Sequence, residues 1–207
     1  NVIGVMSGTS LDGIDLAHIH FTIKENKWSY KILESETISY SIDWLNKLKV
    51  AVSFSKEELI KLNEDYTELL GNIIKSFIDK HQIKNLDVVC SHGHTILHQP
   101  QNGFTLQIGN LPEIAAIIQD VQLGGQGAPL VPIGDRILFS EYDYCLNLGG
   151  FSNVSFEENG NRIAFDISPV NTVLNFYANQ LGLDFDDKGK IARSGKINYE
   201  LLNELNA

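Results

Sequence analysis

Residues 1–15 carry the groups in this chain that could most readily bind a ligand. A short apolar run ends at Met6 and leads into a turn rich in glycine, hydroxyl and carboxylate residues, after which apolar spacing resumes. This pattern predicts a strand, a tight loop and a second strand that returns beside the first. In such a loop, backbone N–H groups and the hydroxyls of Thr9 and Ser10 could hold phosphate oxygens, and Asp12 and Asp15 could hold the Mg²⁺ of a nucleotide. An ordinary hairpin turn stays open as the alternative, because glycine, serine and aspartate are common turn residues.

A second glycine turn occurs where the chain partly repeats its pattern. Residues 146–153, Leu-Asn-Leu-Gly-Gly-Phe-Ser-Asn, stand in a predicted three-stranded meander, at the place that the first turn has in the opening strands. Two glycine and hydroxyl turns on facing hairpins could grip a phosphate chain from both sides. Two unrelated hairpin turns are the alternative, and the shared strand-turn-strand context favours the first interpretation.

A group of polar residues follows a buried strand predicted at Leu86–Ser91. They are His92, His94, Thr95, His98 and, in the next predicted strand, Gln107. Ligands of open α/β sheets collect just past the ends of such strands. Three histidines between positions 92 and 98 could also indicate a metal site, so ligand contact and metal binding both stay open at this point.

Composition and charge narrow the class of protein. The chain has 207 residues, 43% of them hydrophobic and 20% charged, with a formal net charge of −10. Nucleic acids and anionic membranes attract basic surfaces, so neither is an expected partner. Cys90 and Cys145 stand in apolar runs and are expected as buried free thiols rather than as a disulfide. The sequence has no apolar stretch of about 18 residues and no signal peptide, which predicts a soluble, cytoplasmic protein.

The order of elements predicts a mixed α/β protein. Antiparallel strands open the chain, and the apolar stripe of Lys56–Lys80 predicts a long helix with Ser55 at its N-cap. Helix and strand then alternate, and the antiparallel set partly repeats after residue 140. We therefore expect two related lobes, residues 1–130 with the first glycine turn and residues 131–207 with the second.

Five segments together resemble the anhydro-N-acetylmuramic acid kinases. Gly4–Asp15 is similar to the opening signature of that family, and residues 91–98, 105–109, 120–132 and 164–172 are similar to its H-G-Q-T-x-x-H, T-L-Q-I-G, D-x-x-x-G-G-Q-G-A-P-L-V-P and F-D-T-G-P-G-N segments. His94 stands where the family usually has glutamine, and Ser168 and Val170 replace two glycines. Five motifs in one order, over residues 2 to about 199, make the resemblance specific. It implies a two-lobed α/β fold like that of actin, Hsp70 and hexokinase (ribonuclease H-like), with mixed sheets flanked by helices and with the family's C-terminal part missing.

The resemblance also implies an activity and its cofactors. Such a kinase uses ATP and Mg²⁺ to phosphorylate O6 of 1,6-anhydro-N-acetylmuramic acid while water opens the anhydro bridge, which gives N-acetylmuramic acid 6-phosphate in bacterial peptidoglycan recycling. The expected partners are this sugar and ATP, without nucleic acid or membrane, and a homodimer stays open. Another sugar kinase of the superfamily, or an ATP-binding module without catalysis, stays as the alternative.

Matched positions assign roles to individual residues. The first phosphate loop comprises Gly8, Thr9, Ser10, Leu11, Asp12, Gly13, Ile14 and Asp15, and the second comprises Asn147, Gly149, Gly150 and Asn153. The sugar is assigned to His92, His94, Thr95, His98 and Gln107, because the matched positions favour sugar contact over a metal. Asp12 is expected to organise Mg²⁺. Asp166, predicted to end a strand beside the second loop, is expected to orient the metal or its water, and either aspartate could instead cap a turn.

One departure from the family pattern concerns the catalytic base. The family carries a D-F-R segment shortly upstream of D-x-x-x-G-G-Q-G, and its aspartate is the expected group that activates water. In this chain positions 115–117 hold Ala-Ala-Ile, and a strand is missing as well. Either a stretch between about Ile118 and Gln119 is absent from this sequence, or the chain cannot perform the hydrolytic half-reaction; the missing strand favours the first. Asp120 is the remaining candidate for a catalytic carboxylate.

Overall fold

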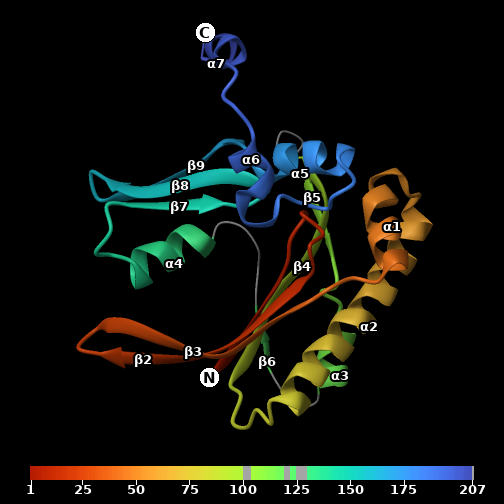
Figure 1. Ribbon diagram of the computed structural model, residues 1–207. Coiled ribbons are helices and arrows are strands. Elements are labelled where there is room, and N and C mark those ends of the chain that lie inside the picture. The colour runs from red at the N-terminus through yellow and green to blue at the C-terminus, as the bar shows by residue number, and fades with distance from the viewer. Residues whose placement is uncertain (100–103, 119–121, 125–129, 207) are drawn as a thin grey trace. The chain divides into compact units, whose positions relative to one another are not determined.

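The computed structural model describes residues 1–99, 104–118, 122–124 and 130–206 (Figure 1). The chain divides into two compact units, Asn1–Cys145 with Ser155–Ala164, and Leu146–Val154 with Phe165–Ala207. The predicted mixed α/β class is confirmed, because a mixed sheet and flanking helices make up the first unit. Among the described residues, no helix is both long enough and apolar enough to cross a membrane.

Three antiparallel strands begin the first unit, as predicted. β1 (Val2–Ser7) pairs with β2 (Ile14–Lys24), which pairs with β3 (Lys27–Ile38). Glu25 and Asn26 form the turn between β2 and β3 with φ of 51° and 63°, the left-handed conformation that a tight two-residue hairpin requires. Side chains of β1 and β2 that alternate along each strand are buried: Ile3, Val5, Ile14 and Leu16. One face of this sheet therefore belongs to the core.

Strand β4 (Val88–Gln99) is longer than the sequence pattern predicts. Its start pairs in parallel with β1 and with the short β6 (Gln122–Gly124), and its second half pairs antiparallel with β5 (Phe104–Ile108). The sheet order is β3-β2-β1-β4-β5, with β6 beside β4. The prediction that the strand ends at Ser91 was wrong because the following residues find a hairpin partner in β5. The histidine segment consequently lies within a strand and not past its end.

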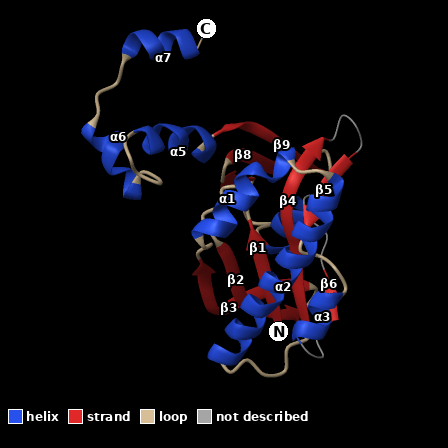
Figure 2. Cartoon of the chain, turned by 90° about the vertical axis from the view of Figure 1, so that its right-hand side faces the viewer, coloured by secondary structure: helices blue, strands red, loops and turns tan. Residues whose placement is uncertain are grey.

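The long helix predicted at Lys56–Lys80 is confirmed as α2. Glu58 N–H donates to Ser55 Oγ at 3.3 Å, and Ser55 N–H donates to Glu58 Oε2 at 2.7 Å, so the predicted N-cap is a complete capping box. Buried side chains from α2 pack against those of β1, β2 and β4 in one core. Helices α1 (Ile42–Val50) and α3 (Glu113–Ile118) add side chains to the same core and lie on the same side of the sheet as α2 (Figure 2).

A second, three-stranded sheet contains the second glycine turn. β7 (Tyr144–Leu148), β8 (Phe151–Glu158) and β9 (Asn161–Pro169) pair in sequence order. Two-residue turns join them, which only antiparallel neighbours allow, so the predicted meander is confirmed. β8 begins directly after Gly150, and Ser152 Oγ at its start donates to the Ser168 carbonyl of β9 at 3.1 Å. β9 continues to Pro169, so Asp166 lies inside a strand and not at a strand end as predicted.

The remaining helices are α4 (Leu130–Leu138), α5 (Asn171–Gln180), α6 (Lys190–Ser194) and α7 (Tyr199–Leu205), with a short 3₁₀ turn at each of Ala51–Ser53 and Asp187–Gly189. The sequence pattern does not predict α4, whose stretch contains Pro132 and Gly134. Proline is tolerated in the first turn of a helix, which explains why the helix still forms. Ser155 Oγ of β8 donates to Asp135 Oδ2 of α4 at 2.5 Å, which ties this helix to the second sheet.

A charged cluster joins the end of α2 to β3. Lys80 Nζ and His81 Nε2 lie 2.5 and 2.6 Å from Glu36 Oε1. Hydrogen bonds from these two side chains lower the pKa of Glu36 below its ordinary value. The cluster holds the last turn of the longest helix against the sheet edge.

Replacement of the N-cap tests the contribution of α2 to stability. We expect Ser55→Ala to lower the free energy of unfolding by about 1 kcal/mol, because the N–H of Glu58 loses its acceptor. Urea unfolding followed by circular dichroism measures the difference. Ser140→Ala, at an exposed turn, is the matched control and should stay within about 0.5 kcal/mol of the wild type. Equal effects of the two substitutions would contradict the capping role.

The Glu36 cluster predicts a pH dependence of stability. A carboxyl whose pKa is lowered by folding stabilises the protein above the pKa it has in the unfolded chain, and this stabilisation is lost as the pH falls through the folded-state pKa. We expect Glu36→Gln to destabilise the protein at neutral pH and to reduce the further loss of stability on acidification. Urea unfolding at a series of pH values, from neutral down through the folded-state pKa of Glu36, checks both effects. Glu141→Gln at an exposed position is the control. If the Glu36→Gln variant lost as much stability on acidification as the wild type, Glu36 would not be the group responsible.

Candidate functional site

A bulge in β4 brings the first glycine loop and the histidine segment together. Val5 pairs with Ser91, but Ser7 pairs with His94, so β4 advances three residues where β1 advances two. Gly93 has φ +70° in the bulge, and a Cβ there would lie 2.0 Å from the Ile108 carbonyl oxygen, so the position requires glycine. The end of β1 and residues 92–95 are therefore neighbours, although Ser7 and His94 are 87 positions apart in sequence.

The bulge also divides the predicted sugar-binding residues between the two faces of the sheet. In a regular strand His92 and His94 would share a face, but the extra residue turns His94 toward α2, where it is only 3% exposed. On the other face, Gln107 Nε2 donates to Thr95 Oγ1 at 3.2 Å and lies 3.5 Å from His92 Nδ1. We call His92, Thr95 and Gln107 the β4–β5 polar group. The structure brings these three predicted residues together and separates His94 from them.

The first glycine loop, residues 8–13, connects β1 to β2. Leu11 N–H donates to the Gly8 carbonyl at 3.2 Å, and Leu11 itself has φ 59°. Ser10 Oγ donates to Asp12 Oδ1 at 2.7 Å, and both side chains are exposed. Thr9 is exposed beside them. The loop thus presents hydroxyl and carboxylate oxygens to solvent, the donor type that Mg²⁺ and its bound water prefer.

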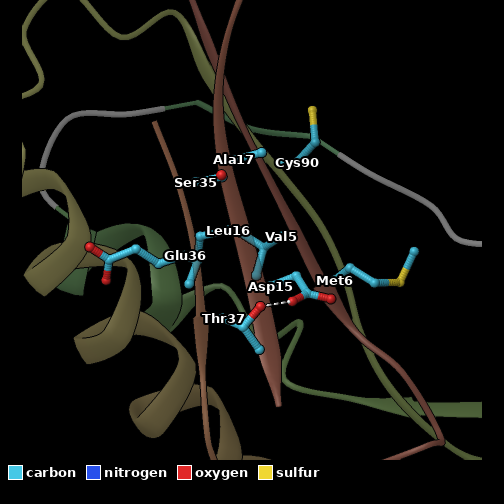
Figure 3. A pocket seen from close by; sticks show the side chains of 10 residues that line it. Val5, Met6, Asp15, Leu16, Ala17, Ser35, Glu36, Thr37 and Cys90 are labelled. Atoms are coloured by element: carbon cyan, nitrogen blue, oxygen red, sulfur yellow. Dashed lines mark hydrogen bonds between the residues drawn. The ribbon is translucent and has the colours of Figure 1, made fainter. Parts of the chain in front are cut away.

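Ile14 and Asp15 belong to β2 rather than to the loop. Ile14 is fully buried in the core, while Thr37 Oγ1 donates to Asp15 Oδ1 at 2.5 Å across the strand pair. Asp15, Thr37 and Met6 line an open pocket of about 590 Å³, with Cys90 further along it (Figure 3). His92 Nε2 lies 3.0 Å from the Met6 sulfur, so the pocket adjoins the β4–β5 polar group.

On the side of α2, His94 contacts the end of β1. Its Nδ1 lies 3.3 Å from the Ser7 carbonyl oxygen, and its ring centre lies 5.9 Å from that of Tyr66. Burial lowers the pKa of His94, which keeps the ring neutral near pH 7. A carbonyl oxygen can only accept, so Nδ1 must carry the proton of the ring.

The second glycine loop, Gly149–Gly150, is attached to the start of α5. The Gly150 carbonyl accepts from Val170 N–H at 2.8 Å and from Thr172 Oγ1 at 3.0 Å. A Cβ on Gly150 would lie 3.1 Å from Thr172 Oγ1, so this residue packs closely against the helix. The flanking Asn147 and Asn153 lie on β7 and β8. This loop and the first loop belong to different units, and their convergence on one ligand stays a prediction.

The structure says less about the remaining predicted residues, two of which it does not describe in full. Asp120 and the side chain of His98 lie outside the described residues. Asp12 and Asp166 are both exposed and belong to different units. In the part of the chain that the structure describes, no three His, Cys, Asp or Glu side chains gather in a way that could hold a metal ion.

Positions 115–117, where the resemblance calls for D-F-R, belong to helix α3. Ile114 and Ile118 are buried at its two ends, and Ile117 packs so closely on α2 that a Cβ on Gly71 would lie 2.9 Å from it. Ile117 therefore serves packing against α2, and positions 115–117, Ala-Ala-Ile, hold no carboxylate.

Sequence reasoning missed Ser7, Tyr40, Tyr66 and the bulge at Gly93. A glycine between two polar residues inside a strand is a signal for a bulge, and the His-Gly-His sequence could have raised that possibility. Nothing in the local sequence pairs the two tyrosines with the end of β1.

Known proteins resemble this chain over its whole length. The family profile for anhydro-N-acetylmuramic acid kinase matches residues 1–207. Relatives with this name include one from Pseudoalteromonas translucida, 34% identical over 99% of this chain and 59% of the relative. Another from Pseudomonas fluorescens is 35% identical over 98% of this chain and 60% of the relative, and one from Bacillus cereus is 34% identical over 97% and 60%. The chain thus spans about three-fifths of the length of these relatives.

Two further findings qualify these similarities. The alignment with the Pseudoalteromonas relative covers 241 positions, more than the 207 residues of this chain, so that relative contains residues with no counterpart here. Among solved structures, YeaZ from Pseudomonas aeruginosa matches 82% of this chain and 69% of its own with a TM-score of 0.29 and 11% identity, a level of similarity that carries no argument. The match of the family profile to every residue, together with relatives above 30% identity, shows that the chain belongs to the anhydro-N-acetylmuramic acid kinase family.

Proposed function

We propose that the protein is an ATP-dependent kinase that converts 1,6-anhydro-N-acetylmuramic acid into N-acetylmuramic acid 6-phosphate in the bacterial cytoplasm. In this reaction water attacks the anomeric carbon and the bond from that carbon to O6 breaks. O6 then takes the γ-phosphoryl group of ATP, and ADP leaves. A base must accept a proton from the attacking water.

The observation that carries this proposal is the pairing of Ser7 with His94. It makes the loop with the nucleotide signature and the β4–β5 polar group neighbours at the C-terminal end of β1. A phosphoryl transfer needs its donor and its acceptor side by side, because most of the catalysis comes from positioning. Family membership supports the same assignment.

Within the proposal, each set of residues has a distinct role. Residues 8–13 of the first glycine loop and the second set, Asn147, Gly149, Gly150 and Asn153, bind the phosphates of ATP. His92, Thr95 and Gln107 hydrogen-bond the sugar, since an amide, a hydroxyl and an imidazole can each donate and accept. Asp12, with Asp166, would hold Mg²⁺ through hard oxygen donors, and this ion neutralises phosphate charge when it is bound.

One observation favours a second candidate, a nucleotide-binding protein without the hydrolytic step. Positions 115–117 hold Ala-Ala-Ile, without a carboxylate that could activate water. The longer aligned stretch of the relatives supports the opposite explanation, in which the base lies in residues that this sequence lacks. The two candidates differ in whether water enters the product.

The deciding experiment uses the protein expressed at its full natural length. We expect incubation with MgATP and anhydro-N-acetylmuramic acid in oxygen-18 water to give ADP and a muramic acid 6-phosphate with one heavy oxygen at C1, detected by mass spectrometry. ADP release with other sugars alone would support a different sugar kinase. Tight MgATP binding without turnover of any sugar would support the second candidate.

The second glycine loop allows a more local test. We expect Gly150→Val to weaken MgATP binding roughly tenfold, because the added side chain displaces Thr172 and with it the loop. Isothermal titration calorimetry measures this affinity. Gly134→Ala in α4, where a Cβ meets nothing within 4 Å, is the control and should bind MgATP as the wild type does. Unchanged MgATP affinity in Gly150→Val, or a loss confined to sugar affinity, would argue against the loop assignment.

A further inference from the structure

A chain of hydrogen-bonded hydroxyls lies under the start of the first glycine loop. The hydroxyls of Tyr40 and Tyr66 are 2.6 Å apart, and the Ser7 hydroxyl lies beside both. One tyrosine donates to the other, which leaves the second free to donate to Ser7 Oγ. Ser7 Oγ also donates to the Gly93 carbonyl in the bulge at 2.8 Å. The chain thus runs from α2, through the segment between β3 and α1, to the last residue of β1 and on to β4.

Most of this chain is removed from water, and Tyr40 at its end is half-buried. Tyr66 is 0% exposed, Ser7 2% and His94 3%. Burial is the main reason why the pKa values of Tyr40 and Tyr66 are raised, so both remain neutral hydroxyls. Buried polar groups cost stability unless every one is hydrogen-bonded, and apolar side chains of similar size would fill the same space. The presence of buried, hydrogen-bonded hydroxyls here, in place of apolar side chains, therefore indicates that they hold the segments they join in fixed relative positions.

The backbone around Tyr66 is built to accept its ring at this point. Gly109, at the end of β5, has φ +88°, and a Cβ there would lie 2.6 Å from Tyr66 Cδ1. Its N–H donates to Asn63 Oδ1 of α2 at 2.7 Å. Trp44 packs edge-on against the ring, with centres 5.5 Å apart. Tyr66 consequently has one position, and its hydroxyl points to the end of β1.

We propose that Ser7, Tyr40, Tyr66 and His94 are positioning residues, which together hold the start of the first glycine loop at a fixed place relative to the β4–β5 polar group. In this arrangement His94 acts through the Ser7 carbonyl and does not touch the sugar. The inference rests on the proposed function only in taking the loop as the ATP site and the polar group as the sugar site. It adds residues from α2 and from the β3–α1 segment that none of the sequence motifs contains.

The hydrogen bond from His94 suggests a conservative substitution. A glutamine has an amide N–H that can donate to the same carbonyl, whereas a leucine of similar size cannot. His94→Gln should therefore preserve the position of the loop, and His94→Leu should release it. Tyr66→Phe removes one hydroxyl from the chain without a change of shape, which guards against the case in which the leucine variant fails to fold.

The experiment compares His94→Gln, His94→Leu and Tyr66→Phe in the protein at its full natural length, with Tyr142→Phe at an exposed position as matched control. Hydrogen exchange of the amides of residues 8–13 measures the loop directly, calorimetry measures MgATP affinity, and steady-state kinetics measures KM for the sugar. We expect His94→Leu and Tyr66→Phe to speed exchange in the loop and to weaken MgATP binding about fivefold each, the effect of one lost buried hydrogen bond. His94→Gln and Tyr142→Phe should match the wild type in both.

Two outcomes would overturn the inference. One is unchanged loop exchange in both His94→Leu and Tyr66→Phe. The other is a change confined to KM for the sugar in both His94 variants, which would make His94 a sugar ligand. Hydrogen exchange of the loop is measured without any substrate, so it tests the positioning role independently of the proposed function. A wild-type protein that neither bound MgATP nor turned over the sugar would refute the proposed function alone.

Discussion

β1 and β4 run side by side as parallel strands, and near the end of β1 the strand β4 gains one residue relative to it. Gly93 makes this possible, because its backbone has a positive φ and approaches the Ile108 carbonyl more closely than any side chain would allow. From that point on, the residues of β4 exchange faces. The bulge thereby sets which polar side chains meet on the outer face and which one, His94, enters the core. The candidate site in the first unit depends on this local change of pairing.

The interior beneath the site is polar, which is unusual for a core built on a stripe of leucine, isoleucine and phenylalanine. Its hydroxyls and the imidazole are satisfied by one another and by backbone carbonyls, so the desolvation cost is offset. Hydrogen bonds are directional, whereas apolar contacts are not. A chain of them between α2 and β1 can therefore define the position of a loop more sharply than side-chain packing alone.

The two glycine loops are stabilised in different ways. In the first, Ser10 bonds to Asp12 within the loop, and Gly13 fits against β3, where a Cβ would lie 2.8 Å from Thr37 Cγ2. In the second, the carbonyl of Gly150 accepts from the first residues of α5. Both arrangements leave little freedom to the turn, which suits the phosphate binding that we propose for these loops.

Local rules of chain geometry account for what the sequence determined by itself. Period-two and helical spacing located β1 to β3 and α2, and a serine followed three residues later by a glutamate marked the capping box. The order of five short motifs identified the family. The extension of β4, the bulge and the burial of His94 needed the tertiary structure, because they depend on pairing with β1 and β5. The contact between Tyr40, Tyr66 and Ser7 likewise joins three separate segments, and no local pattern encodes which distant residue a buried hydroxyl will meet.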